Sequence, residues 1–269
     1  MAARRVFALP YDSGHKGVRM GAGPLRLRDL FDDVEEIDVP GEWRAEIRTS
    51  FVLYGLLAAR VRDAAHEGAM PIVLSGNCGA CAGTVAGLGT EGLGVIWLDA
   101  HGDLMTPDTT TSGFLDGMAL SIVTGQCWRA LTQSVIGLDP IPPQRAIHIG
   151  GRDWSEGEID SGRASGVAIV DAAAFRKDHD RAIESAIETL ARTCDRVVFH
   201  VDLDVIDRSF GAANQYASPG GLSPQDVIAI VGTVQRCMDI AAVNFASYDP
   251  SFDPEGGIVR AVTDIMAAI

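Results

Sequence analysis

Two short acidic motifs carry most of the side chains in this sequence that could do chemistry. The first reads Asp99-Ala-His101-Gly-Asp103, and the second reads Asp202-Leu-Asp204. In an extended backbone, residues i, i+2 and i+4 face the same side, so each motif should present its polar side chains together. Four carboxylates and one imidazole around one point would repel one another unless cations neutralised them. A mixed carboxylate and imidazole set suits Mn²⁺, and the number of ligands indicates two ions.

Such a pair of ions would make a nucleophile available. Two metal ions about 3.5–4 Å apart share a bridging water and lower its pKa, which gives a hydroxide at neutral pH. An isolated Asp-Xaa-Asp at the end of a strand more often forms caps and loop hydrogen bonds. Two such motifs on separate strands, one of them with a central His, favour the metal site.

The elements that must position these motifs follow from hydrophobic spacing. Helical spacing predicts helices over residues 47–66 and 173–192, and Ser223-Pro224 predicts the start of another. Short apolar runs, typical of buried parallel strands, predict strands at residues 6–9, 71–75, 94–99, 146–150, 167–171, 196–204 and 240–248. This alternation predicts an α/β fold of three layers, with helices on both faces of a mainly parallel, doubly wound sheet. In such sheets the working site lies outside the carboxyl ends of the strands, where both acidic motifs occur.

Composition narrows the class of protein. The chain has 269 residues and a formal net charge of −14, and it shows no internal repeat or linker-like shift in composition. We therefore expect a single domain over residues 1–269 that binds neither nucleic acid nor an anionic membrane surface. No apolar run approaches the roughly 18–20 residues of a membrane span. Five cysteines at irregular spacing do not form a disulfide framework, so we expect a cytoplasmic protein.

The order and spacing of the motifs resemble the arginase and agmatinase (ureohydrolase) superfamily, which includes the formimidoylglutamases. The resemblance covers nearly the whole chain. It includes a Gly-rich segment at residues 17–24, a Thr-rich segment at 106–113, a middle loop at 149–158 and Gly-Gly-Leu at 220–222. It implies an arginase-like fold, trimers or hexamers, and hydrolytic cleavage of the C–N bonds of small guanidino or formimidoyl compounds.

The resemblance also implies a binuclear manganese site, with two Mn²⁺ per subunit. Its ligands would be Asp99, His101, Asp103, Asp202 and Asp204, with Asp99 and Asp202 bridging the ions. The family's first ligand motif is typically Gly-Gly-Asp-His, but here the segment ends in Cys78, at the position of the ligating His. A thiolate is softer than an imidazole and suits Mn²⁺ less well, so Cys78 is either a weak ligand or a plain buried thiol, and one ion is expected to be held weakly. A Cys at this position is also similar to hydroxyarginine hydrolases.

The positions that would face the substrate diverge from arginases. Ser112 and Glu158 match the family pattern. Four others differ: Met105 stands where arginases have Asn, Asp116 where they have His, Ser155 where they have Asp, and Ser247 where they have the Glu that clamps the guanidinium. A guanidinium binds best to a planar carboxylate. The loss of that Glu argues against L-arginine and agmatine.

We therefore expect a metal-dependent hydrolase that cleaves a linear C–N bond of an amidine-like or modified guanidino substrate by a metal-bridging hydroxide. Asp103 would orient the hydroxide, and Asp116 would carry a proton to the leaving amine. One alternative is a catalytically silent homologue that binds metal or a partner. Another is a two-metal phosphatase, which would need a cation near the site, and only Arg152 qualifies by position.

Overall fold

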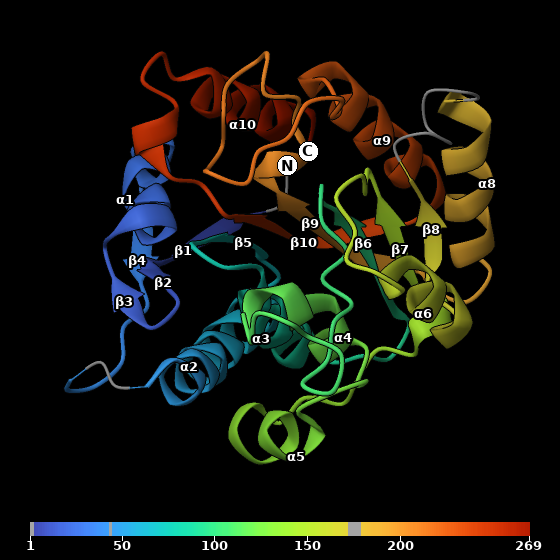
Figure 1. Ribbon diagram of the computed structural model, residues 1–269. Coiled ribbons are helices and arrows are strands. Elements are labelled where there is room, and N and C mark those ends of the chain that lie inside the picture. Colours follow the sequence, from blue (N-terminus) through green and yellow to red (C-terminus); the bar gives the residue numbers. More distant parts are fainter. Residues whose placement is uncertain (1–2, 43–44, 172–178) are drawn as a thin grey trace.

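A parallel sheet runs through the middle of the computed structural model, which describes residues 3–42, 45–171 and 179–269 (Figure 1). Within these residues the main sheet has eight strands in the order β4-β1-β5-β10-β9-β6-β7-β8, and all neighbouring strands pair in parallel. A two-stranded antiparallel ribbon, β2-β3, lies apart from it. The predicted α/β fold with a mainly parallel sheet is confirmed.

The strands of the chain have the following bounds: β1 Arg4–Leu9, β2 Tyr11–Asp12, β3 His15–Lys16, β4 Val34–Glu36, β5 Met70–Ser75, β6 Leu93–Leu98, β7 Ala146–Ile149, β8 Ala168–Val170, β9 Arg196–Asp202 and β10 Asp239–Ala246. The α-helices are α1 Gly23–Leu27, α2 Glu46–His66, α3 Cys81–Leu88, α4 Ala119–Val123, α5 Arg129–Leu131, α6 Glu158–Ser165, α8 His179–Leu190, α9 Pro224–Cys237 and α10 Gly257–Ala268. Short 3₁₀ turns that matter for the site are η3 Cys78–Ala80, η4 Asp116–Met118 and η7 Leu203–Val205.

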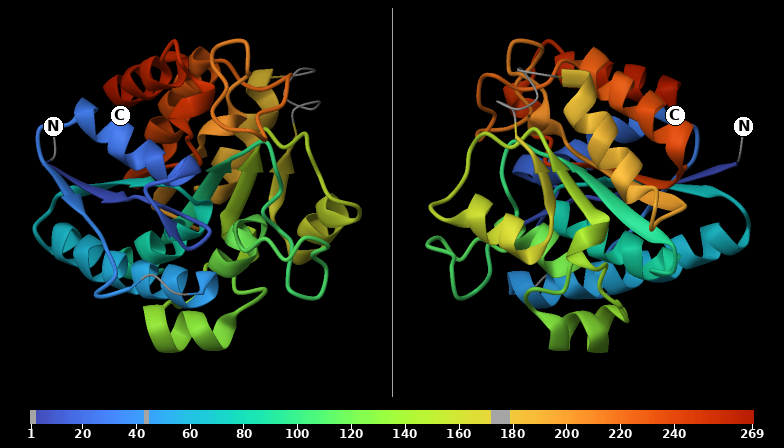
Figure 2. Two further views of the ribbon diagram at one scale, coloured as in Figure 1. Left: turned by 60° about the vertical axis from the view of Figure 1, so that its left-hand side comes forward. Right: turned by 90° about the vertical axis from the view of Figure 1, so that its right-hand side faces the viewer.

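Two apolar cores lie on opposite faces of the sheet. Side chains of β-strands alternate between the faces, so Val95 and Trp97 of β6 join one core, whereas Ile96 and Leu98 join the other. Helices α2, α3 and α4 cover the first face, and α8, α9 and α10 cover the second, as Figures 1 and 2 show. The two cores give the three layers that the sequence predicts.

All seven expected strands are present, with ends that shift by one or two residues. The edge strand β4 was not expected. Helix α2 matches the prediction for residues 47–66. Helix α8 lies within the expected helix 173–192, whose residues 173–178 fall outside the described part of the chain. Ser223 caps α9 as predicted: its hydroxyl accepts from the Asp226 N–H, and the Asp226 carboxylate accepts in return from the Ser223 N–H.

Four neighbouring strands in the centre of the sheet, β5, β10, β9 and β6, end beside one another. Each of them is followed by a residue that the sequence singles out: Cys78 after β5, Ser247 after β10, Asp204 after β9 and Asp99 after β6. The topology therefore brings residues 169 positions apart to one edge of the sheet. Among the described residues, no helix combines the length and apolar character that crossing a membrane requires. The five cysteines are all free thiols.

The turn that carries Cys78 depends on a glycine. A Cβ atom on Gly76 would collide with the carbonyl oxygen of Tyr11. By contrast, a Cβ on Gly117, in another loop of the same edge, would meet nothing within 4 Å.

We expect Gly76→Ala to lower the free energy of unfolding by more than about 2 kcal/mol, because the collision involves backbone on both sides and no flexible side chain can yield. Urea-induced unfolding of this variant and of the matched Gly117→Ala variant measures the difference. Gly117→Ala should stay within about 0.5 kcal/mol of the unaltered protein. Equal stability of the two variants would show that the Gly76 turn adapts.

Candidate metal centre and substrate pocket

The first acidic motif leaves β6 in a tight turn. The Asp99 carboxylate lies at its base, where Oδ2 accepts from Trp97 Nε1 at 3.1 Å and Oδ1 accepts from the His101 N–H at 2.8 Å. Asp103 adopts a left-handed backbone conformation with φ +53°, which is rare for residues other than glycine. Its carbonyl oxygen accepts from the backbone N–H groups of Leu120 and Ser121 at 3.0 and 3.1 Å. The start of α4 therefore holds Asp103 in this strained conformation.

The second motif also leaves the extended conformation. Strand β9 ends at Asp202, not at Asp204 as expected, and Asp204 lies in the 3₁₀ turn η7. The Asp202 Oδ1 atom accepts from the Asp204 N–H at 2.9 Å and so caps this turn. The convergence of the carboxylates thus comes from turns at the strand ends, and the assumption of continuous strand alternation was wrong.

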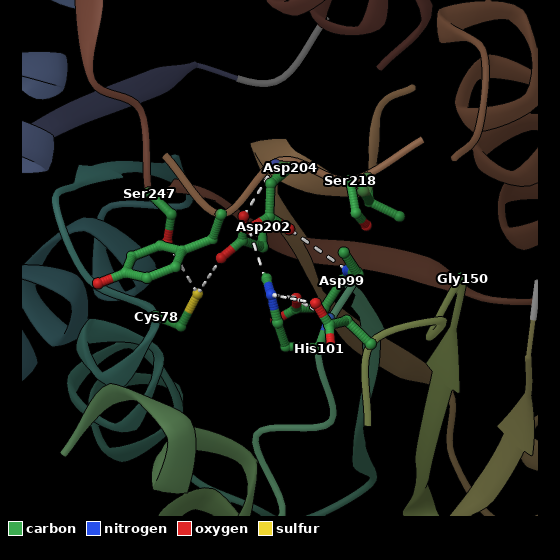
Figure 3. A network of polar contacts seen from close by, with 12 residues as sticks. Cys78, Asp99, His101, Gly150, Asp202, Asp204, Ser218 and Ser247 are labelled. Carbon is green, nitrogen blue, oxygen red and sulfur yellow. Dashed lines mark hydrogen bonds and ion pairs between the residues drawn. The ribbon is translucent and has the colours of Figure 1, made fainter. Parts of the chain in front are cut away.

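The structure nevertheless brings the two motifs into contact. His101 Nδ1 lies 3.3 Å from Asp204 Oδ2 and 3.5 Å from Asp99 Oδ1, as Figure 3 shows. Two sets of three residues have their potential ligand atoms within 4.8 Å of one another: Cys78, Asp99 and Asp103 form one, and Asp99, His101 and Asp204 form the other. Because Asp99 belongs to both sets, the arrangement resembles two adjoining cation sites with one shared carboxylate.

Crowded carboxylates perturb their own ionisation here. Burial, followed by the charge of Asp99, raises the pKa of Asp103, and burial together with Asp204 raises the pKa of Asp202. Burial alone would raise the pKa of Asp204 too, but the neighbouring His101 lowers it to about 2. Burial opposes protonation of His101, yet Asp204 and Asp99 raise its pKa to about 12. The cluster is therefore short of positive charge.

The donor set fits divalent cations. Asp103 Oδ2 is buried and has no hydrogen-bond partner among the described residues, an arrangement that costs stability unless another group satisfies this oxygen. Carboxylate oxygens together with one imidazole are a hard ligand set of the kind that binds Mn²⁺. The predicted ligands are thus placed where they could hold such ions.

Cys78 lies in the same cluster, on the turn η3. Its Sγ donates to Asp202 Oδ2 at 2.9 Å and lies 3.3 Å from Ser247 Oγ (Figure 3). Burial, and next the charge of Asp202, raises the pKa of this thiol above its ordinary value. In this geometry the Cys78 thiol hydrogen-bonds to a neighbouring carboxylate.

A pocket of about 330 Å³ opens above the cluster. Cys78 and Asp99 are buried at its base and do not line it. The other predicted site residues do: His101, Asp103, Met105, Ser112, Asp116, Ser155, Glu158, Asp202, Asp204 and Ser247. The residues predicted to bind substrate and those predicted to bind metal therefore share one cavity.

Asp116 is positioned by the segment around Cys78. Its Oδ1 accepts from the Gly79 N–H and its Oδ2 from the Asn77 side-chain amide, both at 2.9 Å. Burial raises the pKa of Asp116 to about 7, although these donors oppose the shift. A carboxyl group with such a pKa exists in both protonation states near neutral pH, as a proton carrier must.

Glu158 and Ser155 also line the pocket. The two carboxylate oxygens of Glu158 accept from the backbone N–H groups of Leu104 and Ser155, at 3.0 and 2.9 Å. Glu158 therefore fixes the loop after Asp103 to the middle loop. This contact gives it a positioning role, in addition to any contact with substrate.

The sequence did not single out Asn214 and Tyr216. The Asn214 amide is buried and donates to Ser247 O at 2.7 Å and to Asp204 Oδ2 at 3.3 Å. Asn214 Oδ1 accepts from the Tyr216 N–H at 2.8 Å, and Tyr216 lines the pocket. Both residues lie in an irregular loop without short-range spacing to any other polar motif, so the sequence offered no signal for them.

Comparison with known proteins agrees with this geometry. The model of the arginase family matches residues 5–269. The arginase of Bacillus caldovelox is 30% identical over 293 residues, which cover 98% of this chain and 96% of that protein. Its solved structure has a TM-score of 0.89 at 27% identity and covers 100% of this chain and 98% of that one. The formimidoylglutamase of Bacillus subtilis, at 19% identity and a TM-score of 0.78, shares the fold. With a family match over nearly its whole length and the motifs assembled at one edge of the sheet, this chain belongs to the arginase family.

Proposed function

We propose that this protein is a metal-dependent hydrolase that cleaves a linear C–N bond of an amidine-like or modified guanidino substrate. One observation carries the proposal: two ligand sets that share Asp99 lie at the base of a pocket lined by Asp103 and Asp116. Asp99, His101, Asp103, Asp202 and Asp204 would hold two Mn²⁺, with Cys78 as a weak ligand. When bound, the ions would supply a water of lowered pKa that attacks the planar carbon of the substrate.

The protein side chains would direct this attack. Asp103 Oδ2, which has no partner among the described residues, is available to accept a hydrogen bond from the attacking water and to orient it. Asp116, held by Asn77 and Gly79, would give its proton to the nitrogen of the leaving amine as the C–N bond breaks. Ser247, Ser112 and Ser155 would contribute neutral hydrogen-bonding groups around the substrate, and Met105 an apolar one.

A phosphatase is less well supported. Arg152, the one cation near the site by sequence, donates through Nη2 to the carbonyl oxygens of Asp204 and Ser218 at 2.7 and 3.0 Å. Its guanidinium does not line the pocket. Among the described lining residues, a phosphoryl group would therefore lack an Arg or Lys side chain of the kind that stabilises its negative charge.

A substrate panel tests the proposal. The manganese-loaded protein is incubated with guanidino, hydroxyguanidino, amidino and formimidoyl compounds, and the release of urea, hydroxyurea, formamide or ammonia is measured together with that of the amine. Turnover of any of these by C–N cleavage supports the proposal. Release of phosphate from phosphomonoesters would favour the phosphatase, and bound manganese without any turnover would favour a silent homologue.

L-Arginine and agmatine should be poor substrates. Ser247 offers one hydroxyl, which already contacts Cys78, in place of a planar carboxylate partner for the guanidinium. The loss of such a charge-assisted contact costs on the order of 2–3 kcal/mol, which lowers kcat/KM by roughly 30- to 150-fold. Steady-state urea production with manganese measures this. Robust turnover of L-arginine would show that another acid, such as Asp116 or Asp249, replaces the missing carboxylate.

The family also leads us to propose a cytoplasmic homo-oligomer, a trimer or hexamer, that acts on small molecules. Light scattering coupled to gel filtration measures the oligomeric state.

A further inference from the structure

Part of the pocket lining is apolar or aromatic, and the proposed reaction does not account for it. Five such side chains come from separate segments of the chain: Met20, Met105, Phe114, Trp154 and Tyr216. A site that only held the reacting group over the candidate metal cluster would not need such a surface. Its presence indicates that the substrate extends beyond the reacting group.

The ring of Tyr216 lies next to another aromatic lining residue and next to the candidate metal cluster. Its ring centroid lies 6.3 Å from that of Phe114, with the planes tilted by 38°, and 6.2 Å from that of His101, which it meets edge-on. Tyr216 is 44% exposed, so a large part of this residue remains accessible to a ligand. Tyr216 therefore lies beside both Phe114 and His101.

Hydrogen bonds hold the backbone segments that carry the rings of Tyr216 and Phe114. The backbone N–H of Tyr216 donates to buried Asn214, which in turn donates to Asp204 and to the carbonyl oxygen of Ser247. The backbone N–H of Phe114 donates to Ser112 Oγ at 3.2 Å. Since Asn214 connects Tyr216 to both the second acidic motif and the end of β10, the backbone that carries the ring is held beside the cluster.

The carboxylates of the pocket lining favour a cationic ligand. Apart from His101, the ionisable side chains among the described lining residues are acidic or phenolic, and none of those residues is Lys or Arg. Two divalent ions would balance four carboxylates of the cluster and would leave Asp116, Asp153 and Glu158. Planar cations are attracted both by this negative field and by the faces of aromatic rings.

We propose that Tyr216 and Phe114 determine specificity, and that they select N-substituted guanidines or amidines whose substituent is apolar and uncharged. The substituent would pack against the two rings, while the planar cation, which contains the reacting carbon, would sit over the cluster beside Asp103 and Asp204. The neutral hydroxyls of Thr110 and Ser112 also line the pocket, which makes a polar or anionic substituent the competing outcome. This inference rests on the proposed function for the identity of the reacting group.

Binding of three probes tests the proposal without requiring turnover. Calorimetric titration of the manganese-loaded full chain measures the Kd of phenylguanidine, methylguanidine and 4-guanidinobutanoate. We expect phenylguanidine to bind about tenfold more tightly than methylguanidine, because both carry the guanidinium and only the phenyl group adds an aromatic contact. Tyr216→Ala should reduce this ratio to within about twofold, whereas Tyr216→Phe should retain it.

Phe252→Ala is the matched control, because Phe252 has a similarly exposed ring, at 43%, that does not line the pocket. Its ratio should equal that of the unaltered protein. Phe114→Ala, which should also lower the ratio, serves as the second variant if Tyr216→Ala does not fold. Three results would overturn the proposal: no measurable binding of phenylguanidine, a ratio that Tyr216→Ala leaves unchanged, or equally tight binding of 4-guanidinobutanoate.

Turnover is measured separately, so that the two proposals fail in different ways. Selective binding through Tyr216 without any C–N hydrolysis would support the specificity of the pocket and contradict the proposed function. C–N hydrolysis without a preference for apolar substituents would do the opposite.

Discussion

The Asp99→Asn variant should lose nearly all of its bound manganese. Asp99 is the residue common to both ligand sets, so its replacement by a neutral amide removes a ligand from each. Changes in groups that only support a ligand cost 10- to 100-fold in metal affinity, so removal of a shared ligand should cost at least on the order of 100-fold. We expect the manganese content after gel filtration, measured by elemental analysis, to fall below about a tenth of that of the unaltered protein. Hydrolysis of any substrate found should fall in parallel.

A remote carboxylate provides the control. Asp226→Asn changes an acid in the cap of α9, where the carboxylate accepts from the Ser223 N–H. This variant should lose about 1 kcal/mol of stability and keep its manganese. Circular dichroism establishes that both variants are folded. Full manganese content in a folded Asp99→Asn protein would contradict the shared-ligand arrangement.

The Cys78→His variant should hold more manganese than the unaltered protein, with the content rising toward two ions per chain. Cys78 Sγ donates to Asp202 Oδ2, so the thiol must lose this proton before its sulfur can bind a metal ion. A neutral imidazole at this position needs no deprotonation and suits Mn²⁺ better than sulfur does. Manganese content after gel filtration, for both proteins at two pH values, measures the effect.

The pH dependence distinguishes a thiol that can ligate from one that cannot. An ordinary thiol has a pKa of about 8.5, and burial raises the pKa of Cys78 further. Only the thiolate binds metal, so occupancy of this site should be low at neutral pH and rise as the pH is raised. Zn²⁺ should gain relative to Mn²⁺ at this site, because sulfur prefers the softer ion.

The matched control for this experiment is Cys81→Ala, which removes a buried thiol three residues further along whose pKa burial alone raises. It should leave the manganese content and its pH dependence unchanged. Two tightly held manganese ions in the unaltered protein, with no change in Cys78→His, would show that Cys78 is an adequate ligand or not a ligand at all.

The acidic residues that form the cluster could be identified from the sequence, because the two motifs that contain them are short and rich in metal ligands. Their positions directly after apolar runs, as at Leu98, also placed them at the carboxyl edge of a parallel sheet. What the sequence could not give was their local geometry. The left-handed conformation of Asp103 depends on contacts with α4, which lies in another part of the chain, and the turn at Asp204 replaces the end of the expected strand.

The sequence by itself determined the alternation of strands and helices, the two acidic motifs and the replacement of His by Cys at residue 78. These are properties of residue type and of spacing over a few positions, and hydrophobic periodicity and ligand chemistry act at that range. Only the tertiary structure decided that Cys78 donates to Asp202, that Arg152 donates to the Asp204 carbonyl oxygen outside the pocket, and that Tyr216 lies beside His101. Each of these contacts joins residues from different strand ends or loops. They form because the order of strands in the sheet brings those ends together, and no short-range pattern in the chain encodes that order.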